Sequence, residues 1–312
     1  MRLFRHNSGE GPLKRMIQFV RSAQRGDFSA TLPVTSAGEL GELERSLNWL
    51  VDELRQNRDR WDEQKLLQKE LKVSRAIQST LLPAATPEIP GLEIAAFYRP
   101  AKEVGGDYYD FIEVDPDHLG IVVADVAGKS VSGAILMTIT RNTLRAQAML
   151  TLSPAEVLDR TQKMLLPNMM PQFFVSILYG VLDKRFHKLT VANAGHPPLL
   201  HYRGAEKNCE WVHPDGIALG LSRNGTRPPA REERDVMLEA GDLAFFYTDG
   251  LTDIADRSGA YFGRERLAGL AAESGAAGGK GFLLELESRL AAFGGDTPPP
   301  DDMTAVVISR RE

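Results

Sequence analysis

Four short acidic segments lie far apart in the chain, and the need to neutralise their aspartates constrains the fold more than any other feature. Their sequences are VGGDYYD at residues 104–110, ADVAGK at 124–129, YTDG at 247–250 and DDMT at 301–304. Each places an aspartate near a glycine or a second aspartate, beside an apolar or β-branched run, which is typical of a turn at a strand end. One such aspartate alone is equally well explained as a turn former or a helix cap. Four of them favour one shared site, where their repulsion requires hard divalent cations, magnesium or manganese rather than zinc.

The composition is that of a globular protein with no general affinity for nucleic acid. The 312 residues are 43% hydrophobic and 25% charged, and the net charge is −5. The single cysteine, Cys209, permits no intramolecular disulfide, as expected in a reducing compartment. No apolar run approaches the roughly 18 residues that a membrane-spanning helix needs, and the N-terminus has no signal-peptide pattern. We therefore expect a cytoplasmic protein. Basic residues 1–25 are explained as a solvated helix face, and contact with the inner membrane surface, or a juxtamembrane remnant of a longer protein, is the alternative.

The first 57 residues show a pattern of two helices. Pro12 is suited to the first turn of a helix, apolar residues follow at helical spacing, and Gly-Asp at residues 26–27 ends the pattern. After a connector at residues 28–36, a second helix begins near residue 38. Its leucines recur at alternating steps of three and four, which is the pattern of a coiled-coil seam that must find a partner. These leucines are Leu40, Leu43, Leu47, Leu50 and Leu54.

The second helix is expected to continue to about Leu82, before prolines at residues 83, 87 and 90. Beyond residue 54 the seam positions are Asn57, Trp61, Gln64 and Gln68, and apolar residues resume out of phase. A polar or shifted seam weakens a coiled coil locally. The segment is either a simple spacer or, as we prefer, a connector with two packings of similar energy that reports the state of the N-terminal helices.

From residue 92 the pattern changes to short strands and two pairs of helices. We expect strands at residues 92–98, 118–126, 174–182, 188–194, 198–202, 236–238, 243–247 and 303–309. Helices are expected at 130–150 with Ser130 as cap, at 154–166 with Ser153 as cap, from about 264, and at 282–293. Residues 275–281, which are rich in glycine and alanine, are expected to form a mobile loop. This pattern predicts an α+β layered domain.

The order of six motifs resembles the metal-dependent (PPM-type) protein phosphatases, in particular their bacterial SpoIIE/RsbU-like branch. The motifs are GGDYYD, DVAGKSVSG, FFVSILYGVLD, NAGHPP, YTDGLTD and DDMT, and the resemblance covers about residues 85–310. It implies a β-sandwich flanked by helices, with metal ions at one edge, that hydrolyses phosphoserine or phosphothreonine on small regulatory proteins. The implied substrate is a phosphorylated STAS-domain anti-sigma-factor antagonist of a partner-switching pathway.

The same resemblance assigns the metal ligands. Asp107 and Asp125 are implied to bind the first metal pair together with the backbone carbonyl of Val126. Asp249 and Asp301 are implied to complete the second site, so that two Mn²⁺ or Mg²⁺ ions are bound. Two ions of this kind activate a water for in-line attack on a phosphate, and no protein nucleophile is required. The glycines of the first two motifs are expected to permit close backbone packing around this site.

Other residues near the motifs have weaker assignments. Lys102 occupies the place where eukaryotic relatives carry a phosphate-binding arginine, and the alternative is an exposed lysine. We interpret His196 as part of a structural turn because two prolines follow it, although the ordinary pKa of histidine suits acid–base catalysis. Eukaryotic relatives have a histidine where this chain has Ala127, which leaves the general acid unassigned. We prefer Asp301 over Asp302 as the metal ligand of the last motif.

The N-terminal helices resemble a HAMP domain, a parallel homodimeric four-helix signal relay. The resemblance rests on Pro12, Pro33, Asn48, Gly-Asp at residues 26–27 and Glu-Leu-Gly at residues 39–41. We therefore divide the chain into a basic N-terminus and HAMP-like domain at residues 1–57, a coiled-coil signalling helix at 58–84 and a phosphatase domain at 85–312. The expected assembly is a homodimer through the N-terminal helices, which gates the phosphatase. HAMP domains usually follow a transmembrane helix, which this sequence lacks, so the input signal stays open.

Two other functions compete with a gated phosphatase. The first is a signalling scaffold, in the form of a degenerate and catalytically weak phosphatase. The presence of all four acids argues against it. A metal-dependent nuclease or nucleotide hydrolase also uses aspartate clusters. The sequence has neither a P-loop signature nor a basic, aromatic-rich stretch to support that reading.

Overall fold

The computed structural model describes residues 2–3, 11–128, 131–221, 230–295 and 297–311. The chain divides into two compact units, Met1–Lys72 and Val73–Glu312, and the division falls inside the long helix α2 (Gly38–Ser79). The predicted continuation of this helix past residue 55 is confirmed, although it ends at Ser79 rather than at about Leu82. Residues 73–84 pack with the second unit, ahead of the start at residue 85 that the sequence suggested.

The first unit is held together by a small core and by a buried carboxylate. Helix α1 (Pro12–Gln24) packs on the first part of α2 through a core of Met16, Phe19, Leu32 and Val51. Glu44 on α2 is fully buried, and its carboxylate accepts hydrogen bonds from the backbone N–H groups of Thr35 and Ser36, at 2.9 and 3.0 Å. These bonds satisfy a charge that would be costly to bury alone, so the connector between the helices is fixed on α2.

The leucine seam faces outward from the single chain. Leu40, Leu43, Leu50 and Leu54 remain 43–48% exposed, although they are among the most apolar side chains of α2. An apolar stripe of this kind is expected to be covered by another surface. The homodimer predicted from it stays a prediction, because the structure contains one chain.

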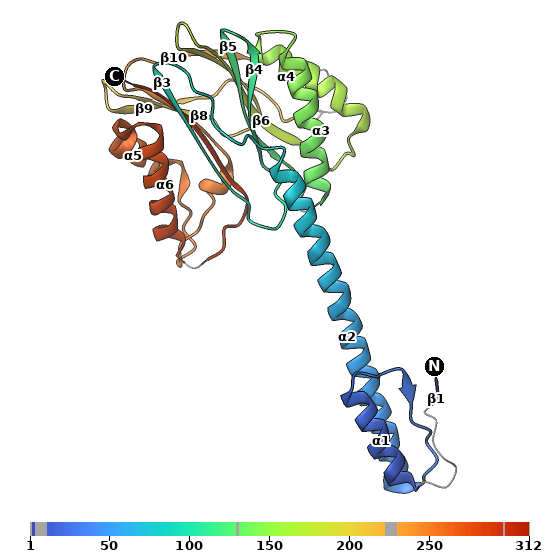
Figure 1. Cartoon of the computed structure of the whole chain (residues 1–312). Coiled ribbons are helices and arrows are strands. Elements are labelled where there is room, and N and C mark those ends of the chain that lie inside the picture. The colour runs from blue at the N-terminus through green and yellow to red at the C-terminus, as the bar shows by residue number, and fades with distance from the viewer. Residues whose placement is uncertain (1, 4–10, 129–130, 222–229, 296, 312) are drawn as a thin grey trace. The chain divides into compact units, whose positions relative to one another are not determined.

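The second unit is a sandwich of two five-stranded antiparallel sheets (Figure 1). The first sheet has the order β10-β7-β6-β5-β4, formed by β4 (Tyr108–Asp115), β5 (His118–Val126), β6 (Val175–Asp183), β7 (Lys188–Ala194) and β10 (Glu233–Met237). The second has the order β3-β12-β11-β8-β9, formed by β3 (Leu92–Arg99), β8 (Leu199–Arg203), β9 (Asn208–Val212), β11 (Leu243–Tyr247) and β12 (Met303–Arg310). The inner faces are filled by buried aliphatic and aromatic side chains such as Ile121, Leu178, Phe246 and Val306.

Helices cover the outer face of each sheet (Figure 1). Helices α3 (Val131–Ala148) and α4 (Pro154–Leu165) pack on the first sheet, and α5 (Gly263–Ser274) and α6 (Gly278–Gly294) pack on the second. The predicted α+β sandwich flanked by helices is therefore confirmed. Ser153 caps α4 as expected, since its hydroxyl accepts a hydrogen bond from the backbone N–H of Glu156 at 3.1 Å. The other expected cap, Ser130, lies outside the described residues.

The prediction of a mobile loop at residues 275–281 is wrong. Gly275–Ala277 form a short 3-10 helix, and α6 already begins at Gly278. The small residues let this helix start directly against the second sheet: the backbone N–H of Gly279 donates to Ser309 Oγ at 2.8 Å, and that of Lys280 donates to Glu93 Oε2 at 3.2 Å. Side chains of the sheet thus satisfy N–H groups that the first turn of any helix leaves unpaired.

Two strands of the second unit were not predicted, and neither were the two-residue strands β1 (Arg2–Leu3) and β2 (Ala30–Thr31) of the first. β4 begins at Tyr108, inside the first acidic motif, and its buried Asp110 interrupts the alternation that would have marked it as a strand. The Asp110 carboxylate is satisfied by the Tyr108 hydroxyl at 2.6 Å and by Arg145 of α3 at 2.5 Å. β9 is a short edge strand with little buried surface.

Candidate metal centre

The four predicted aspartates lie at one end of the sandwich. Asp107 immediately precedes β4, and Asp125 is the penultimate residue of the neighbouring, antiparallel strand β5. In the other sheet Asp249 follows the end of β11, and Asp301 precedes the start of its neighbour β12. Each acid therefore sits where a rigid strand meets a turn, as the sequence suggested, and both sheets contribute two.

A cavity of about 220 Å³ opens at this end of the sandwich. Its lining includes Lys102, Asp125, Val126 and Asp301, four of the six residues proposed from the sequence, together with Gly106, Gly128 and Phe174. Lys102 is exposed at this cavity, so its ammonium group is available to an anion there. Among the described residues, the cavity lining thus combines carboxylates with the cation of Lys102, as a site for metal ions and a phosphate requires.

Asp107 lies behind the cavity wall and is held by two threonines. Only 2% of it is exposed, and its Oδ2 accepts hydrogen bonds from the hydroxyls of Thr248, at 2.7 Å, and Thr304, at 2.5 Å. Burial and the nearby charge of Asp125 raise the pKa of Asp107 well above its ordinary value. A divalent cation would relieve both effects, because it stabilises the ionised carboxylate.

Asp249 belongs to a second group of acids. Burial raises its pKa, and the charges of Asp253 and Asp301 raise it further. Asp253 was not selected from the sequence, although it is the last residue of the motif YTDGLTD. The two threonines around Asp107 were missed as well, and they too lie within the motifs YTDG and DDMT.

The donor set fits hard divalent cations that keep much of their own water. Among the described residues, no three His, Cys, Asp or Glu side chains are close enough to share one ion. Each ion would therefore be held by one or two carboxylates, with carbonyl groups such as that of Val126 and water in the remaining positions. This is the usual coordination of magnesium in enzymes. All candidate donors are oxygen atoms, which disfavours zinc.

Asp302 supports the backbone beside the site. Its Oδ1 accepts a hydrogen bond from the N–H of Ala101 at 2.7 Å, and its Oδ2 accepts one from the N–H of Gly106 at 2.6 Å. The carboxylate is buried and already satisfied. Asp301, which lines the cavity, therefore remains our choice for the ligand.

His196 connects the two sheets near the metal centre. Ser176 Oγ donates to its Nδ1 at 2.9 Å, and its Nε2–H donates to the carbonyl of Tyr247 at 3.0 Å. Burial lowers the pKa of His196 to about 3. Both ring nitrogens are engaged and the imidazole stays neutral, which supports the structural interpretation and argues against a catalytic acid.

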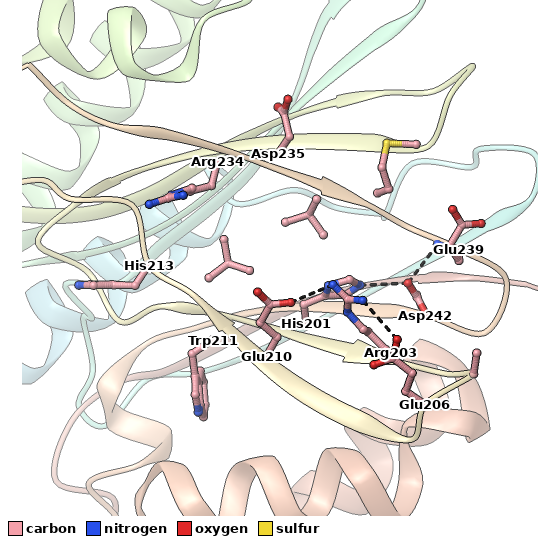
Figure 2. Close-up of a pocket in the computed structure, with 14 residues that line it drawn as sticks. His201, Arg203, Glu206, Glu210, Trp211, His213, Arg234, Asp235, Glu239 and Asp242 are labelled. Atoms are coloured by element: carbon pink, nitrogen blue, oxygen red, sulfur yellow. Dashed lines mark hydrogen bonds and ion pairs between the residues drawn. The ribbon is translucent and has the colours of Figure 1, made fainter.

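A larger cavity, of about 640 Å³, lies between the β8–β9 hairpin and β10 (Figure 2). Its charges largely pair with one another: Arg203 contacts Glu206 and Glu210, and His201 Nε2 lies 3.0 Å from Asp242. None of the four predicted aspartates lines it. This cavity is therefore not the site that the sequence motifs indicate.

Comparison with known proteins identifies both units. Residues 115–311 match the family described as Stage II sporulation protein E (SpoIIE), and residues 11–56 match the HAMP domain. The chain belongs to the SpoIIE family. This family consists of metal-dependent protein phosphatases, and the chain is a protein serine/threonine phosphatase with an N-terminal HAMP domain. Lys102 and Asp107 precede the matched residues, so their assignment rests on the geometry described above.

Individual SpoIIE-family relatives agree with this identification. The chain is 26% identical over 248 residues to phosphoserine phosphatase RsbU of Bacillus subtilis, covering 80% of this chain and 72% of RsbU. A structure of the RsbU and RsbW domains of a Mycobacterium tuberculosis protein is 28% identical, with a TM-score of 0.61, over 74% of this chain and 63% of that one. The SiaA-PP2C domain of Pseudomonas aeruginosa has the same fold, with 24% identity and a TM-score of 0.68 over 80% and 98% of the two chains.

In the described part of the chain, no helix combines the length and apolar character that crossing a bilayer requires.

Proposed function

We propose that the protein hydrolyses phosphoserine or phosphothreonine at a centre of two Mn²⁺ or Mg²⁺ ions held by Asp107, Asp125, Asp249, Asp301 and the carbonyl of Val126. The observation that carries this proposal is the cavity that brings Asp125, Val126 and Asp301 together, with the buried carboxylate of Asp107 close enough for the charge of Asp125 to raise its pKa. When bound, two such ions activate water and neutralise phosphoryl oxygens.

The chain's own residues prepare this site. Thr248 and Thr304 fix Oδ2 of Asp107, so a metal ion would bind this carboxylate through its other oxygen. Lys102 is placed to pair with a phosphoryl oxygen of the substrate, because it is exposed on the cavity rim among the acids. Asp302 holds the backbone that carries Asp107, so this carboxylate is pre-oriented before substrate binds.

We propose a phosphorylated STAS-domain anti-sigma-factor antagonist as the substrate, in a cytoplasmic partner-switching pathway. Similarity to RsbU, which is named a phosphoserine phosphatase, supports this choice, as does the relative in which RsbU and RsbW domains occur together. Contact with the inner membrane surface through the basic N-terminus is compatible with this role and is not required for it.

The decisive experiment measures phosphate release from a phosphoserine protein by the full chain, with and without Mn²⁺. Activity that requires metal and is lost in Asp107→Asn and Asp249→Asn supports the proposal. Metal-independent phosphate release would refute the metal centre. Absence of any turnover, combined with stable binding of the phosphoprotein, would favour the signalling scaffold instead. Capture of the bound protein by Asp249→Asn would then identify the natural substrate.

We further propose that the protein is a parallel homodimer through residues 12–82, and that this dimer gates the phosphatase. The exposed leucine seam of α2 supports the assembly. Because residues 73–84 pack with the phosphatase unit, a truncation should begin at Val73 and keep them. If light scattering finds this fragment as dimeric as the full chain, the seam is not the principal interface.

A further inference from the structure

The last turn of α2 reaches the backbone of the metal centre through one buried glutamine. Gln78 is 5% exposed. Its Nε2–H donates to the carbonyl of Gly105 at 2.7 Å, and the N–H of Gly105 donates back to its Oε1 at 3.2 Å. A single side-chain amide therefore satisfies both polar groups of one residue, as a neighbouring strand would. Gly105 lies two residues before Asp107.

The backbone that Gln78 contacts is closely packed and leaves no space for a side chain at Gly105 or Gly106. A Cβ atom on Gly105 would lie 2.5 Å from the Tyr98 hydroxyl, and one on Gly106 would lie 2.7 Å from the carbonyl oxygen of Val126. From the side of β12, Asp302 accepts the N–H of Gly106. We therefore expect a displacement of Gly105 to disturb Gly106 and, with it, two of the proposed ligands, Asp107 and the Val126 carbonyl.

The end of α2 is itself anchored in the phosphatase unit. Leu81 and Leu82, which follow the helix, pack on the core between the first sheet and helices α3 and α4. The N–H of Leu81 donates to the carbonyl of Gln78 at 2.9 Å, which closes the helix at this point. Gln78 therefore stands between an anchored helix end and the ligand-bearing loop.

We infer that Gln78 is a positioning residue that sets the metal affinity of the centre by holding the Gly105–Gly106 backbone in place. This inference rests on the proposed metal centre and names the contact through which α2 acts on it. Glutamine is required because the contact needs one donor and one acceptor on the same planar group. Glutamate would place an oxygen against the Gly105 carbonyl, and asparagine would be one methylene too short.

The test measures Mn²⁺ binding to the full chain by titration calorimetry, without substrate. Gln78→Glu and Gln78→Met keep the length of the side chain and remove the paired amide. We expect the dissociation constant for Mn²⁺ to rise at least about tenfold, equivalent to about 1.4 kcal/mol. Turnover should recover toward the wild-type rate at saturating Mn²⁺, because the variants weaken metal binding and leave the ligands intact.

Ser79→Glu and Ser79→Ala are matched controls on the same turn. Ser79 is exposed, and its hydroxyl bonds only to the carbonyl of Ala76 in its own helix, among the contacts that the structure describes. The first variant adds the same charge one residue further on, and both should bind Mn²⁺ as the wild type does. Melting in a chelator shows which variants are folded. If Gln78→Glu does not fold, Gln78→Met carries the test.

The outcomes separate this inference from the proposed function. If folded Gln78 variants bind Mn²⁺ within about twofold of the wild type, or more tightly, while Asp107→Asn abolishes binding, the positioning role is refuted and the metal centre stands. If Asp107→Asn also leaves binding unchanged, the metal centre itself is wrong, and the inference falls with it. The positioning role of Gln78 is supported if the Gln78 variants bind Mn²⁺ more weakly than the wild type while the Ser79 controls bind it equally well.

Discussion

Replacement of Asp107 by asparagine should stabilise the metal-free protein while it destroys metal binding. The folded protein raises the pKa of this carboxyl, so at neutral pH the ionised form opposes folding. Each unit by which the pKa is raised corresponds to about 1.4 kcal/mol of lost stability above that pKa. For a domain of this size, each kcal/mol of relieved penalty raises the melting temperature by roughly 2–4 °C. Asparagine keeps an oxygen for the hydroxyls of Thr248 and Thr304.

The sign of the pH dependence follows from the same shift. Because the folded-state pKa is raised, the favourable contribution of a protonated Asp107 is complete below the ordinary aspartate pKa and is lost as the pH rises through the folded value. Metal-free wild type should therefore lose stability over this range relative to Asp107→Asn. Saturating Mn²⁺ should reverse the order, since a ligand at 100 times its dissociation constant contributes about 2.7 kcal/mol.

The assay is thermal unfolding followed by tryptophan fluorescence, in a chelator and in Mn²⁺. Trp49 and Trp61 are exposed residues of α2, so their replacement by phenylalanine leaves Trp211 as the reporter. The ring of Trp211 lies 6.2 Å from that of Tyr247, next to the metal end of β11. Asp302→Asn is the matched control and should destabilise the protein with and without metal, because it removes an acceptor from buried N–H groups. A lower melting temperature for Asp107→Asn in the chelator, or a full response to Mn²⁺, would refute the reasoning.

Three other predictions address separate parts of the molecule. Asp249→Asn should lose most manganese-dependent activity, while its metal-free melting temperature should stay at or above that of the wild type because burial and neighbouring acids raise the pKa of Asp249 as well; activity retained at saturating Mn²⁺ would remove Asp249 from the ligand set. His196 has a folded-state pKa of about 3, below its unfolded value, so its contribution to stability is present above about pH 6.5 and is lost as the pH falls toward 3, by up to about 1.4 kcal/mol per pH unit. Urea unfolding between pH 7.5 and 5 should show a shallower loss in His196→Gln, and an unchanged slope would contradict the assignment. Leucine at residues 57, 64 and 68 together should strengthen the seam and shift the basal rate or the manganese requirement; wild-type values for rate, metal dependence and dimer stability would make the connector a spacer.

The strands and the acidic motifs could be read from the sequence because their signals are local. Apolar runs such as that of β5, and aspartates beside glycine, indicate strand ends without knowledge of the rest of the chain. Local sequence cannot decide whether Asp301 or Asp302 is the metal ligand, because the two aspartates are adjacent in the same motif. What distinguishes them in the structure is a pair of backbone N–H groups, on Ala101 and Gly106, from a distant part of the chain.

The supporting residues could not be predicted for the same reason. Gln78 is one polar residue on a long polar helix, and nothing in its neighbourhood signals a buried partner. Thr248 and Thr304 are β-branched residues at strand ends, where threonine is common on propensity alone. The glycines of residues 275–281 predicted a mobile loop. The sequence does not show that Ser309 and Glu93, which lie on the neighbouring sheet, accept hydrogen bonds from the first turn of α6. The conformational preference of glycine favours a loop at these residues, but packing against the second sheet makes them helical.

The gating that we propose would make helical phase a functional variable, because Gln78 lies near the end of an uninterrupted helix. Residues 73–79 of α2 belong to the phosphatase unit and the rest of the helix belongs to the first unit. One residue inserted between them would rotate everything upstream by about 100° about the helix axis. Seven inserted residues would change the rotation by only about 20°. On the proposed dimeric gating, an input domain that ends in a helix of the right phase should be able to replace the HAMP domain, and length differences among functional exchanges should cluster near multiples of seven.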